Sequence, residues 1–308
     1  MTTATASEQA AVLALTRATP AEWFRTATVI YEVGSALAVL DGRTGLLSDV
    51  HHEYAAQLRS RVRSEHLQEA ERLVERAATH EARLLTVLDK DYPANLQLVY
   101  NRPPFIWVRG NLLPDDFRAI AIVGTRQASE DGLSRAARLA SSLARNGVTV
   151  LSGLARGIDT AAHRATLDVK GRTIAVLGTG ILSSTYPKEN KQLTEDIVKN
   201  GALISQFWPD APPRRAHFPM RNIVMSGMAM GTVVVEASST SGAKMQARLA
   251  LEHGKRLFLL ESLVQSQDWA KKYAERPGTT IVRQLDDVLN VLVKLANEPQ
   301  QLELTFSD

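Results

Sequence analysis

From Phe117 onward, short apolar segments rich in valine, isoleucine and leucine alternate with more polar, helix-forming segments. Several of these polar segments end in glycine, at Gly147, Gly171, Gly201 and Gly254. Glycine is common just after a helix because it readily adopts a left-handed conformation, and strands buried on both faces read as continuous apolar runs. The alternation therefore predicts a doubly wound α/β fold, in which helices cover both faces of a mostly parallel sheet.

The part of the chain before Phe117 has a different character. Residues 7–85 carry apolar side chains at steps of three and four residues, a pattern typical of amphipathic helices. Four prolines then interrupt residues 86–116, which are expected to form a connector leading into a strand at 105–110. The predicted organisation is a small helical N-terminal domain at 1–85, a connector with its first strand at 86–116, the α/β core at 117–296 and a C-terminal tail at 297–308.

Composition excludes several classes of protein. The 308 residues include no cysteine, so disulfides and thiolate chemistry are excluded, which is consistent with a cytoplasmic location. Neither a signal peptide nor a run of about 18 apolar residues is found, so no membrane partner is expected. The formal net charge is only +3, so any surface for a polyanion must come from local clustering of basic residues.

Three loops that follow predicted strands carry residues suited to binding phosphate. Glycine lets the backbone approach an anion closely, while hydroxyl groups, guanidinium groups and the first N–H groups of a helix are donors. Because the carboxyl ends of parallel strands meet at one edge, we expect the three loops to line one site. Their candidate residues are Gly124, Thr125 and Arg126 in the first loop, Ser152, Gly153, Arg156, Gly157 and Asp159 in the second, and Gly178, Thr179, Gly180 and Lys188 in the third.

Each loop also has a simpler explanation. None matches G-x-G-x-x-G or the G-K-[ST] ending of a P-loop, so standard dinucleotide and NTPase sites fit poorly. Ser129 is expected to cap the helix after the first loop, with Arg126 solvated, and Asp159 or Thr160 to cap the helix after the second. His163 lies four residues after Asp159, on the same face of the predicted helix. An ion pair on that face or a capping contact is favoured over a catalytic role for it.

A nine-residue stretch, 214–222, follows the predicted strand at 202–207 and is rich in positive charge. It includes Arg214, Arg215, Phe218, Arg221 and Asn222. Single-stranded nucleic acids are bound by positive charge that follows the backbone and by rings that stack on bases. A charge run alone is more often a solvated face, but its place after a strand favours a nucleic-acid site.

Two further residues have alternative roles. Glu236 ends a buried strand and is expected to accept hydrogen bonds from a ribose or from the second loop, or to neutralise nearby arginines. Tyr186 either stacks on a base or anchors its loop. The sequence contains no recognisable metal-ligand set, hydrolase triad or paired carboxylates, so no catalytic residue, metal or cofactor is predicted. These residues predict a binding site rather than an enzyme.

Several stretches, taken in order, resemble the DNA-processing protein A (DprA, or Smf) family. They are "GTRQASEDG", "SGLARGIDTAAHRATL", "TIAVLGTG", "YPKEN", "FPMRN" and "VVVEASSTSGA", and the resemblance runs from about Asp91 to Leu260. It implies an extended Rossmann-like core that binds single-stranded DNA without sequence preference, forms a homodimer and delivers DNA to the RecA recombinase during natural transformation. It also implies that the protein is not an enzyme.

The resemblance also assigns roles by position. Arg126, Arg156 and Arg221 would contact phosphates, and Phe218 would be structural or stack on a base. The further phosphate contacts would be Lys188, Arg214 and Arg215, and the remaining pocket-lining positions are Ser152, Gly153, Gly157, Asp159, Gly178, Asn222 and Glu236.

The chain departs from the family pattern at several places. Ile223 stands where arginine is usual, Gln206 where an acidic residue is common, and residues 261–277 replace a Pro-Gly segment near the expected dimer surface. A C-terminal winged-helix module is also expected to be absent. These departures indicate a divergent member, in a mobile-element or defence context. They leave two alternatives: a sensor that holds a free nucleotide, favoured by Ile223, and an antitoxin-like regulator of a toxin-like partner, favoured by residues 261–277.

Overall fold

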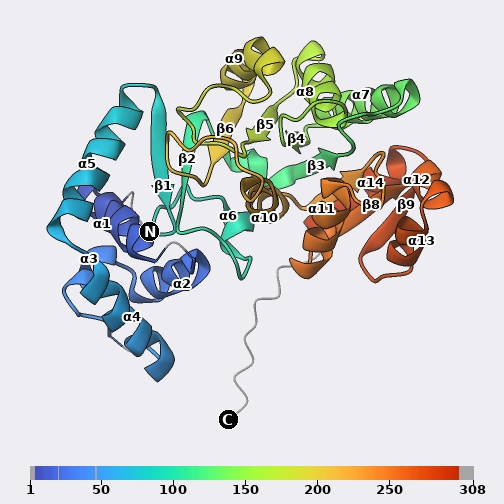
Figure 1. The fold of residues 1–308 in the computed structure, drawn as a ribbon. Coiled ribbons are helices and arrows are strands. Elements are labelled where there is room, and N and C mark those ends of the chain that lie inside the picture. Colours follow the sequence, from blue (N-terminus) through green and yellow to red (C-terminus); the bar gives the residue numbers. More distant parts are fainter. Residues whose placement is uncertain (1–3, 20, 46, 298–308) are drawn as a thin grey trace.

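The computed structural model describes residues 4–19, 21–45 and 47–297. The described residues form a nine-stranded sheet in the order β1-β2-β6-β5-β4-β3-β7-β8-β9 (Figure 1). The strands are β1 (Ala82–Thr86), β2 (Phe105–Gly110), β3 (Ala119–Val123), β4 (Thr149–Ser152), β5 (Thr173–Val176), β6 (Ala202–Ser205), β7 (Gly231–Val234), β8 (Arg256–Leu260) and β9 (Thr279–Val282). β2 is antiparallel to both of its neighbours, and the pairs from β6 to β9 are parallel. The predicted α/β fold is confirmed.

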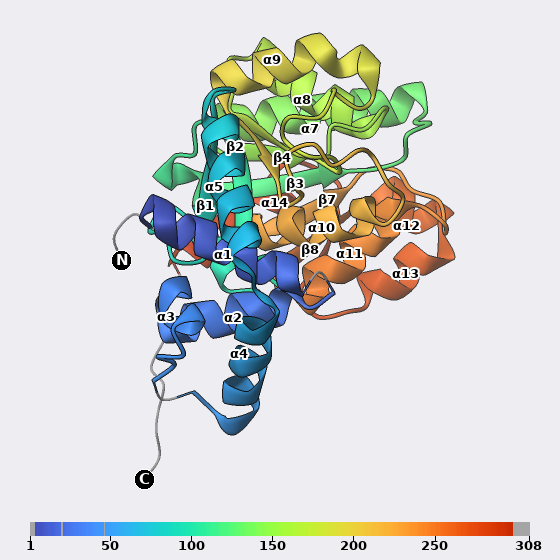
Figure 2. The same ribbon diagram turned by 60° about the vertical axis from the view of Figure 1, so that its left-hand side comes forward.

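Helices cover both faces of this sheet. α7 (Glu130–Arg145), α8 (Ile158–Asp168) and α9 (Lys191–Asn200) lie in a row on one face, and α10 (His217–Met228) and α11 (Gly242–Glu252) lie together on the other (Figures 1 and 2). The central strands β3 to β7 are fully buried, as their apolar sequences predict. The other described helices that follow the N-terminal region are α6 (Ala94–Gln97), α12 (Glu261–Ser266), α13 (Asp268–Ala274), α14 (Asp286–Asn297) and the 3₁₀ helices η1 (Pro114–Arg118) and η2 (Lys188–Asn190).

Serine hydroxyls fix where two of the core helices begin. The Ser129 hydroxyl accepts a hydrogen bond from the Gly132 amide at the start of α7, and Ser241 does the same for Ala243 at the start of α11. Such a hydroxyl satisfies an amide that has no partner within the helix. The Ser129 cap is the simpler of the two roles that the sequence allows for the first loop, and it is confirmed.

The N-terminal region is helical up to residue 78. It comprises α1 (Ala6–Ala18), α2 (Trp23–Val33), α3 (Ala36–Leu40), α4 (Asp49–Arg61) and α5 (Ser64–Ala78). The prediction of helices as far as residue 85 is wrong at its end, because β1 pairs with β2 from Ala82 opposite Arg109 to Thr86 opposite Phe105. This pairing supplies hydrogen-bond partners for the backbone groups along the edge of β2. It also buries two leucines of β1.

These helices lie beside the β1–β2 end of the sheet (Figure 1). No described helix is long and apolar enough to cross a membrane. All but the first residue of the predicted 297–308 tail lies outside the described residues.

Candidate nucleic-acid interface

The three predicted loops lie side by side at one edge of the sheet, because β3, β4 and β5 are neighbouring parallel strands. Two adjoining hollows lie at this edge and share Arg126, Ala155, Arg156 and Phe218. The larger has a volume of about 510 Å³ and extends to the start of α11, and the smaller reaches the third loop at Tyr186. We call the two hollows together the strand-end groove.

Most of the predicted site residues line the strand-end groove. They are Gly124, Thr125, Arg126, Gly153, Arg156, Asp159, Gly178, Thr179, Phe218, Arg221 and Asn222. The predicted residues that do not line it are Ser152, Gly157, Gly180, Lys188, Arg214, Arg215 and Glu236. Residues that the sequence did not single out also contribute, among them Met225, Met245 and Gln246 from α10 and α11. Their helical spacing is that of ordinary core residues, so the sequence carried no sign of this role.

Two exposed arginines mark the rim of the groove. The Arg126 guanidinium lies 5.0 Å from the centre of the Phe218 ring, a cation–π arrangement. Arg156 donates from Nε to the Glu189 carboxylate, which raises the pKa of the arginine. The Arg156 side chain is exposed, so its two terminal nitrogens are accessible from solvent. Both guanidinium groups can therefore meet a phosphate from solvent.

Arg221 lies at the floor of the groove rather than at its rim. The residue is only 6% exposed, and Nη1 donates to the Val176 carbonyl at 2.8 Å. Its neighbour Asp159 is also buried. Burial lowers the pKa of Arg221 and raises the pKa of Asp159, and each charge opposes the shift of the other. The buried Arg221 thus contributes positive charge to the floor of the strand-end groove, and the Asp159 carboxylate partly balances that charge.

Asp159 holds the second loop closed. Its carboxylate accepts hydrogen bonds from the Gly153 amide at 3.1 Å and the Ala155 amide at 3.3 Å. The Thr160 hydroxyl donates to the Ala155 carbonyl at 2.6 Å. The prediction that Asp159 or Thr160 caps α8 is therefore wrong, because both side chains bind the loop that precedes the helix.

Several predicted donors are already used inside the protein. The Thr125 amide donates to the Glu236 carbonyl at 2.7 Å, and the Gly180 amide donates to the Ala211 carbonyl at 2.8 Å. The buried Ser152 hydroxyl donates to the Ile122 carbonyl at 2.6 Å. Gly157 lies so close to the Thr125 carbonyl that a β-carbon there would overlap it. These amide and hydroxyl groups hold the loops in shape and are not free to bind a ligand.

Glu236 connects β7 to the first loop. Its Oε2 accepts hydrogen bonds from the Ser129 amide at 3.2 Å and from the Ser129 hydroxyl at 2.7 Å. Among the described hydrogen bonds and ion pairs, its carboxylate meets neither the second loop nor an arginine, so those two expectations are wrong. The carboxylate is instead attracted to the first N–H groups of α7.

His163 is fully buried and hydrogen-bonded through Nδ1 to the Thr173 hydroxyl at 2.7 Å. That hydroxyl donates to the Val150 carbonyl, so Nδ1 carries the proton and donates to Thr173. Nε2 has no described partner, as suits a neutral ring, and burial lowers the pKa of His163 to about 3. The expected helix-face or capping contact with Asp159 is therefore wrong, and His163 is a core residue.

Gly178 lines the smaller hollow, whereas Lys188, Arg214 and Arg215 lie outside the strand-end groove. Gly178 lies against Phe218, where an added β-carbon would be 3.0 Å from the ring. Lys188 lines a different cavity, of about 660 Å³, together with Lys191. Arg214 and Arg215 are exposed in the loop that leads into α10.

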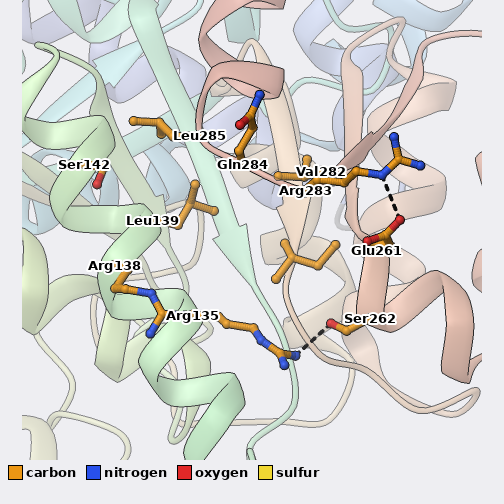
Figure 3. Close-up of a pocket in the computed structure, with 11 residues that line it drawn as sticks. Arg135, Arg138, Leu139, Ser142, Glu261, Ser262, Val282, Arg283, Gln284 and Leu285 are labelled. Atoms are coloured by element: carbon orange, nitrogen blue, oxygen red, sulfur yellow. Dashed lines mark hydrogen bonds and ion pairs between the residues drawn. The ribbon is translucent and has the colours of Figure 1, made fainter.

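A separate cavity of about 360 Å³ lies at the ends of β8 and β9 (Figure 3). There Arg135 of α7 donates to the Ser262 hydroxyl at 2.8 Å, and Arg283 donates to Glu261 at 2.8 Å. Three leucines and Val282 also line this cavity. None of the predicted site residues, all of which lie in the described part of the chain, lines this cavity. The unusual segment 261–277 thus contributes to a different part of the surface.

Known proteins match this chain over most of its length. A sequence profile described as DNA recombination-mediator protein A matches residues 83–293. The DNA processing protein DprA of Streptococcus pneumoniae is 36% identical over 205 residues, which cover 66% of this chain and 72% of that protein. Protein Smf of Escherichia coli is 41% identical over 170 residues, which cover 55% of this chain and 45% of that protein.

Solved structures give the same result. The X-ray structure of Streptococcus pneumoniae DprA matches with a TM-score of 0.68 and 28% identity, covering 94% of this chain and 98% of that one. A structure of Helicobacter pylori DNA processing protein A, described for its single-stranded DNA binding mode, shares the fold with a TM-score of 0.60 and 24% identity, covering 70% of this chain and 96% of that one. Together with the profile, these matches show that the chain belongs to the DNA recombination-mediator protein A family.

Proposed function

We propose that this protein binds single-stranded DNA without sequence preference through the strand-end groove. The observation that carries the proposal is the placement of two exposed arginines, Arg126 and Arg156, beside the Phe218 ring in one groove. Guanidinium groups pair with phosphates of any sequence, and an aromatic ring stacks on any base. This arrangement therefore favours a binding protein for a polynucleotide strand.

The hydrogen bonding of the loops supports a strand rather than a free nucleotide. Nucleotide-binding loops present several unpaired backbone amides to the phosphates. In this protein the amides of Thr125, Gly153 and Gly180 already donate to other groups of the chain. These amides are therefore not available to a phosphate, which increases the share of phosphate binding that falls to the arginine side chains. Ile223, which favoured a nucleotide sensor, does not line the groove.

Membership of the family supports a role in DNA processing and recombination. Its named relatives are DNA processing proteins, and the Helicobacter pylori protein is described by its single-stranded DNA binding mode. We extend the proposal to the partners that the family resemblance implies, a second copy of the chain and the RecA recombinase. No described contact favours a toxin-like partner.

The test is fluorescence anisotropy with a labelled oligothymidylate over a series of salt concentrations. Arg126→Ala/Arg156→Ala is compared with wild type and with Arg145→Ala, which removes an exposed arginine at the far end of α7. Losing two phosphate contacts should lower the slope of log affinity against log salt by about 1.4 for a single strand. Unlabelled mononucleotide and duplex DNA are added as competitors.

The expected result is that the double variant binds at least tenfold more weakly at low salt and Arg145→Ala binds like wild type. Equal affinity of wild type and the double variant would overturn the assignment of the groove. Full displacement of the oligonucleotide by a mononucleotide at equal concentration would favour the nucleotide sensor instead.

A further inference from the structure

The loop between β6 and α10, residues 206–216, connects the helical N-terminal region to the proposed DNA site. We call it the β6–α10 loop. Its first half touches the helices α1, α2 and α5, and its second half carries the exposed Arg214 and Arg215. Phe218, which lines the strand-end groove, follows within the first turn of α10.

An aromatic cluster holds the first half of the loop. The Trp208 ring lies 6.4 Å from the Trp23 ring of α2 and 5.5 Å from the Phe105 ring of β2, measured between ring centres. The Arg17 guanidinium of α1 lies 5.1 Å from the centre of the Trp208 ring. Trp208, which is half-buried, thus packs against groups from the helical region and from β2.

An ion pair makes a second attachment. Arg76, in the last turn of α5, donates to the Asp210 carboxylate, and both side chains are substantially exposed. Asp210 is only two residues beyond Trp208. The helical region therefore contacts the loop at two closely spaced points.

The third loop holds the same residues from the other side. The amides of Gly180 and Leu182 donate to the carbonyls of Ala211 and Pro209, both at 2.8 Å. The Ser183 hydroxyl also donates to Ala211, at 2.8 Å. Gly180 fits so tightly that a β-carbon there would overlap the backbone of Trp208 and Pro209. Residues 208–211 are thus fixed between the helical region and the groove wall.

The fixed residues 208–211 determine where the segment that carries Arg214 and Arg215 starts. Pro212 and Pro213 link it to Arg214, and proline restricts the backbone angle φ to a narrow range. The loop is followed by His217, the first residue of α10. The His217 ring stacks on the Phe207 ring at 4.1 Å between ring centres, and its Nδ1 lies 3.2 Å from the Gly178 carbonyl oxygen. The segment carrying the two arginines is short and anchored at both ends.

We propose that Trp208 and Asp210 are positioning residues, through which the helical N-terminal region sets the place of Arg214 and Arg215 along the bound DNA strand. The inference rests on the proposed function. Anchoring means that the loop does not have to be ordered when DNA binds, so the arginines meet the phosphates at a lower cost in conformational entropy.

A double-mutant cycle tests the inference. Affinity for oligothymidylate and its salt dependence are measured for wild type, Trp208→Ala, Arg214→Ala/Arg215→Ala and the triple combination. Trp269→Ala is the matched control, because it removes a buried tryptophan of α13, which is not part of the groove or of the β6–α10 loop. Thermal unfolding is recorded for every variant.

Trp208→Ala is expected to lower affinity about threefold to tenfold and to reduce the salt slope by up to about 1.4, the effect of two lost phosphate contacts. In the background without the two arginines it should cause no further loss, and Trp269→Ala should leave affinity and slope unchanged. A merely structural role would not produce this dependence on the background.

Arg76→Ala provides a second route that leaves the core intact, since it removes only the exposed partner of Asp210. Arg76→Ala should weaken DNA binding about twofold in the wild-type background. In the Arg214→Ala/Arg215→Ala background it should cause no further loss. Equal losses in both backgrounds, or full affinity of folded Trp208→Ala, would overturn this inference alone. Absence of DNA binding by the wild type would overturn the proposed function itself.

Discussion

The Arg221 guanidinium lies directly against the α-carbon of Gly153, where a β-carbon would overlap Nη1. That nitrogen donates to the Val176 carbonyl at 2.8 Å, and Arg221 is nearly inaccessible to solvent. Gly153→Ala should therefore displace a buried charge from its acceptor and lower the free energy of unfolding by about 2–4 kcal/mol. Urea denaturation measures this change.

Gly242→Ala is the matched control for that substitution. Gly242 also lines the strand-end groove, but a β-carbon there would have no neighbour within 4 Å. Its stability should match wild type or exceed it slightly, because alanine favours the helical conformation. If both alanine variants unfold at the same urea concentration, the close approach of Arg221 to Gly153 has no energetic consequence.

Glu236 is predicted to act through stability rather than through direct contact with DNA. Its carboxylate accepts from the amide and hydroxyl of Ser129, the residue that caps α7. Glu236→Ala should lower the free energy of unfolding by about 1–2 kcal/mol, and Glu236→Gln, which keeps an acceptor oxygen, should recover part of it. Urea denaturation and DNA titration are run in parallel. A loss of DNA affinity at unchanged stability would instead indicate that the carboxylate meets the ribose.

Burial of neutral histidine predicts that the protein loses stability in acid. Burial lowers the pKa of His163 from 6.5 to about 3 and that of His253 from 6.5 to about 4. Below pH 6.5 the unfolded chain takes up protons at these positions while the folded protein does not. The stabilisation is therefore complete above pH 6.5 and is lost as the pH falls toward 4 and 3.

The measurement for this prediction is urea denaturation at pH 7, 6 and 5. Each histidine adds up to about 1.4 kcal/mol per pH unit to the slope of unfolding free energy against pH. His163→Gln should reduce the slope between pH 6 and 5 by nearly that amount, and His253→Gln should do the same. A wild-type slope in His163→Gln would show that the ring takes up a proton within the folded protein.

The sequence predicts the position of the groove well because parallel strands bring their following loops to one edge. Arg126 and Arg156 follow neighbouring strands, so their proximity follows from the alternation of strands and helices. The sequence could not predict which donors are free. The partner of the Gly180 amide, Ala211, lies far along the chain, and the depth of Arg221 depends on the space left by Gly153. β1 was missed because it is a short edge strand directly after a charged helix.

Tyr186 and Phe218 are expected to contribute stacking that salt does not weaken. Their ring centres are 6.1 Å apart across the smaller hollow of the groove, and Tyr186 is 44% exposed. Loss of one stacked base costs about 1–3 kcal/mol, so Tyr186→Ala should weaken binding roughly 5- to 150-fold. Because no phosphate contact is lost, the salt slope should stay at the wild-type value, unlike that of Arg126→Ala/Arg156→Ala.

Tyr186→Phe separates the ring from the hydroxyl. It keeps the aromatic face, so its affinity should lie close to wild type at every salt concentration. Phe218→Ala should behave differently from Tyr186→Ala, because Phe218 also supports the Arg126 guanidinium at 5.0 Å. Its loss should reduce both the affinity and the salt slope. If Tyr186→Phe binds as weakly as Tyr186→Ala, the hydroxyl group rather than the ring contacts the DNA, and Tyr186 is not a stacking residue.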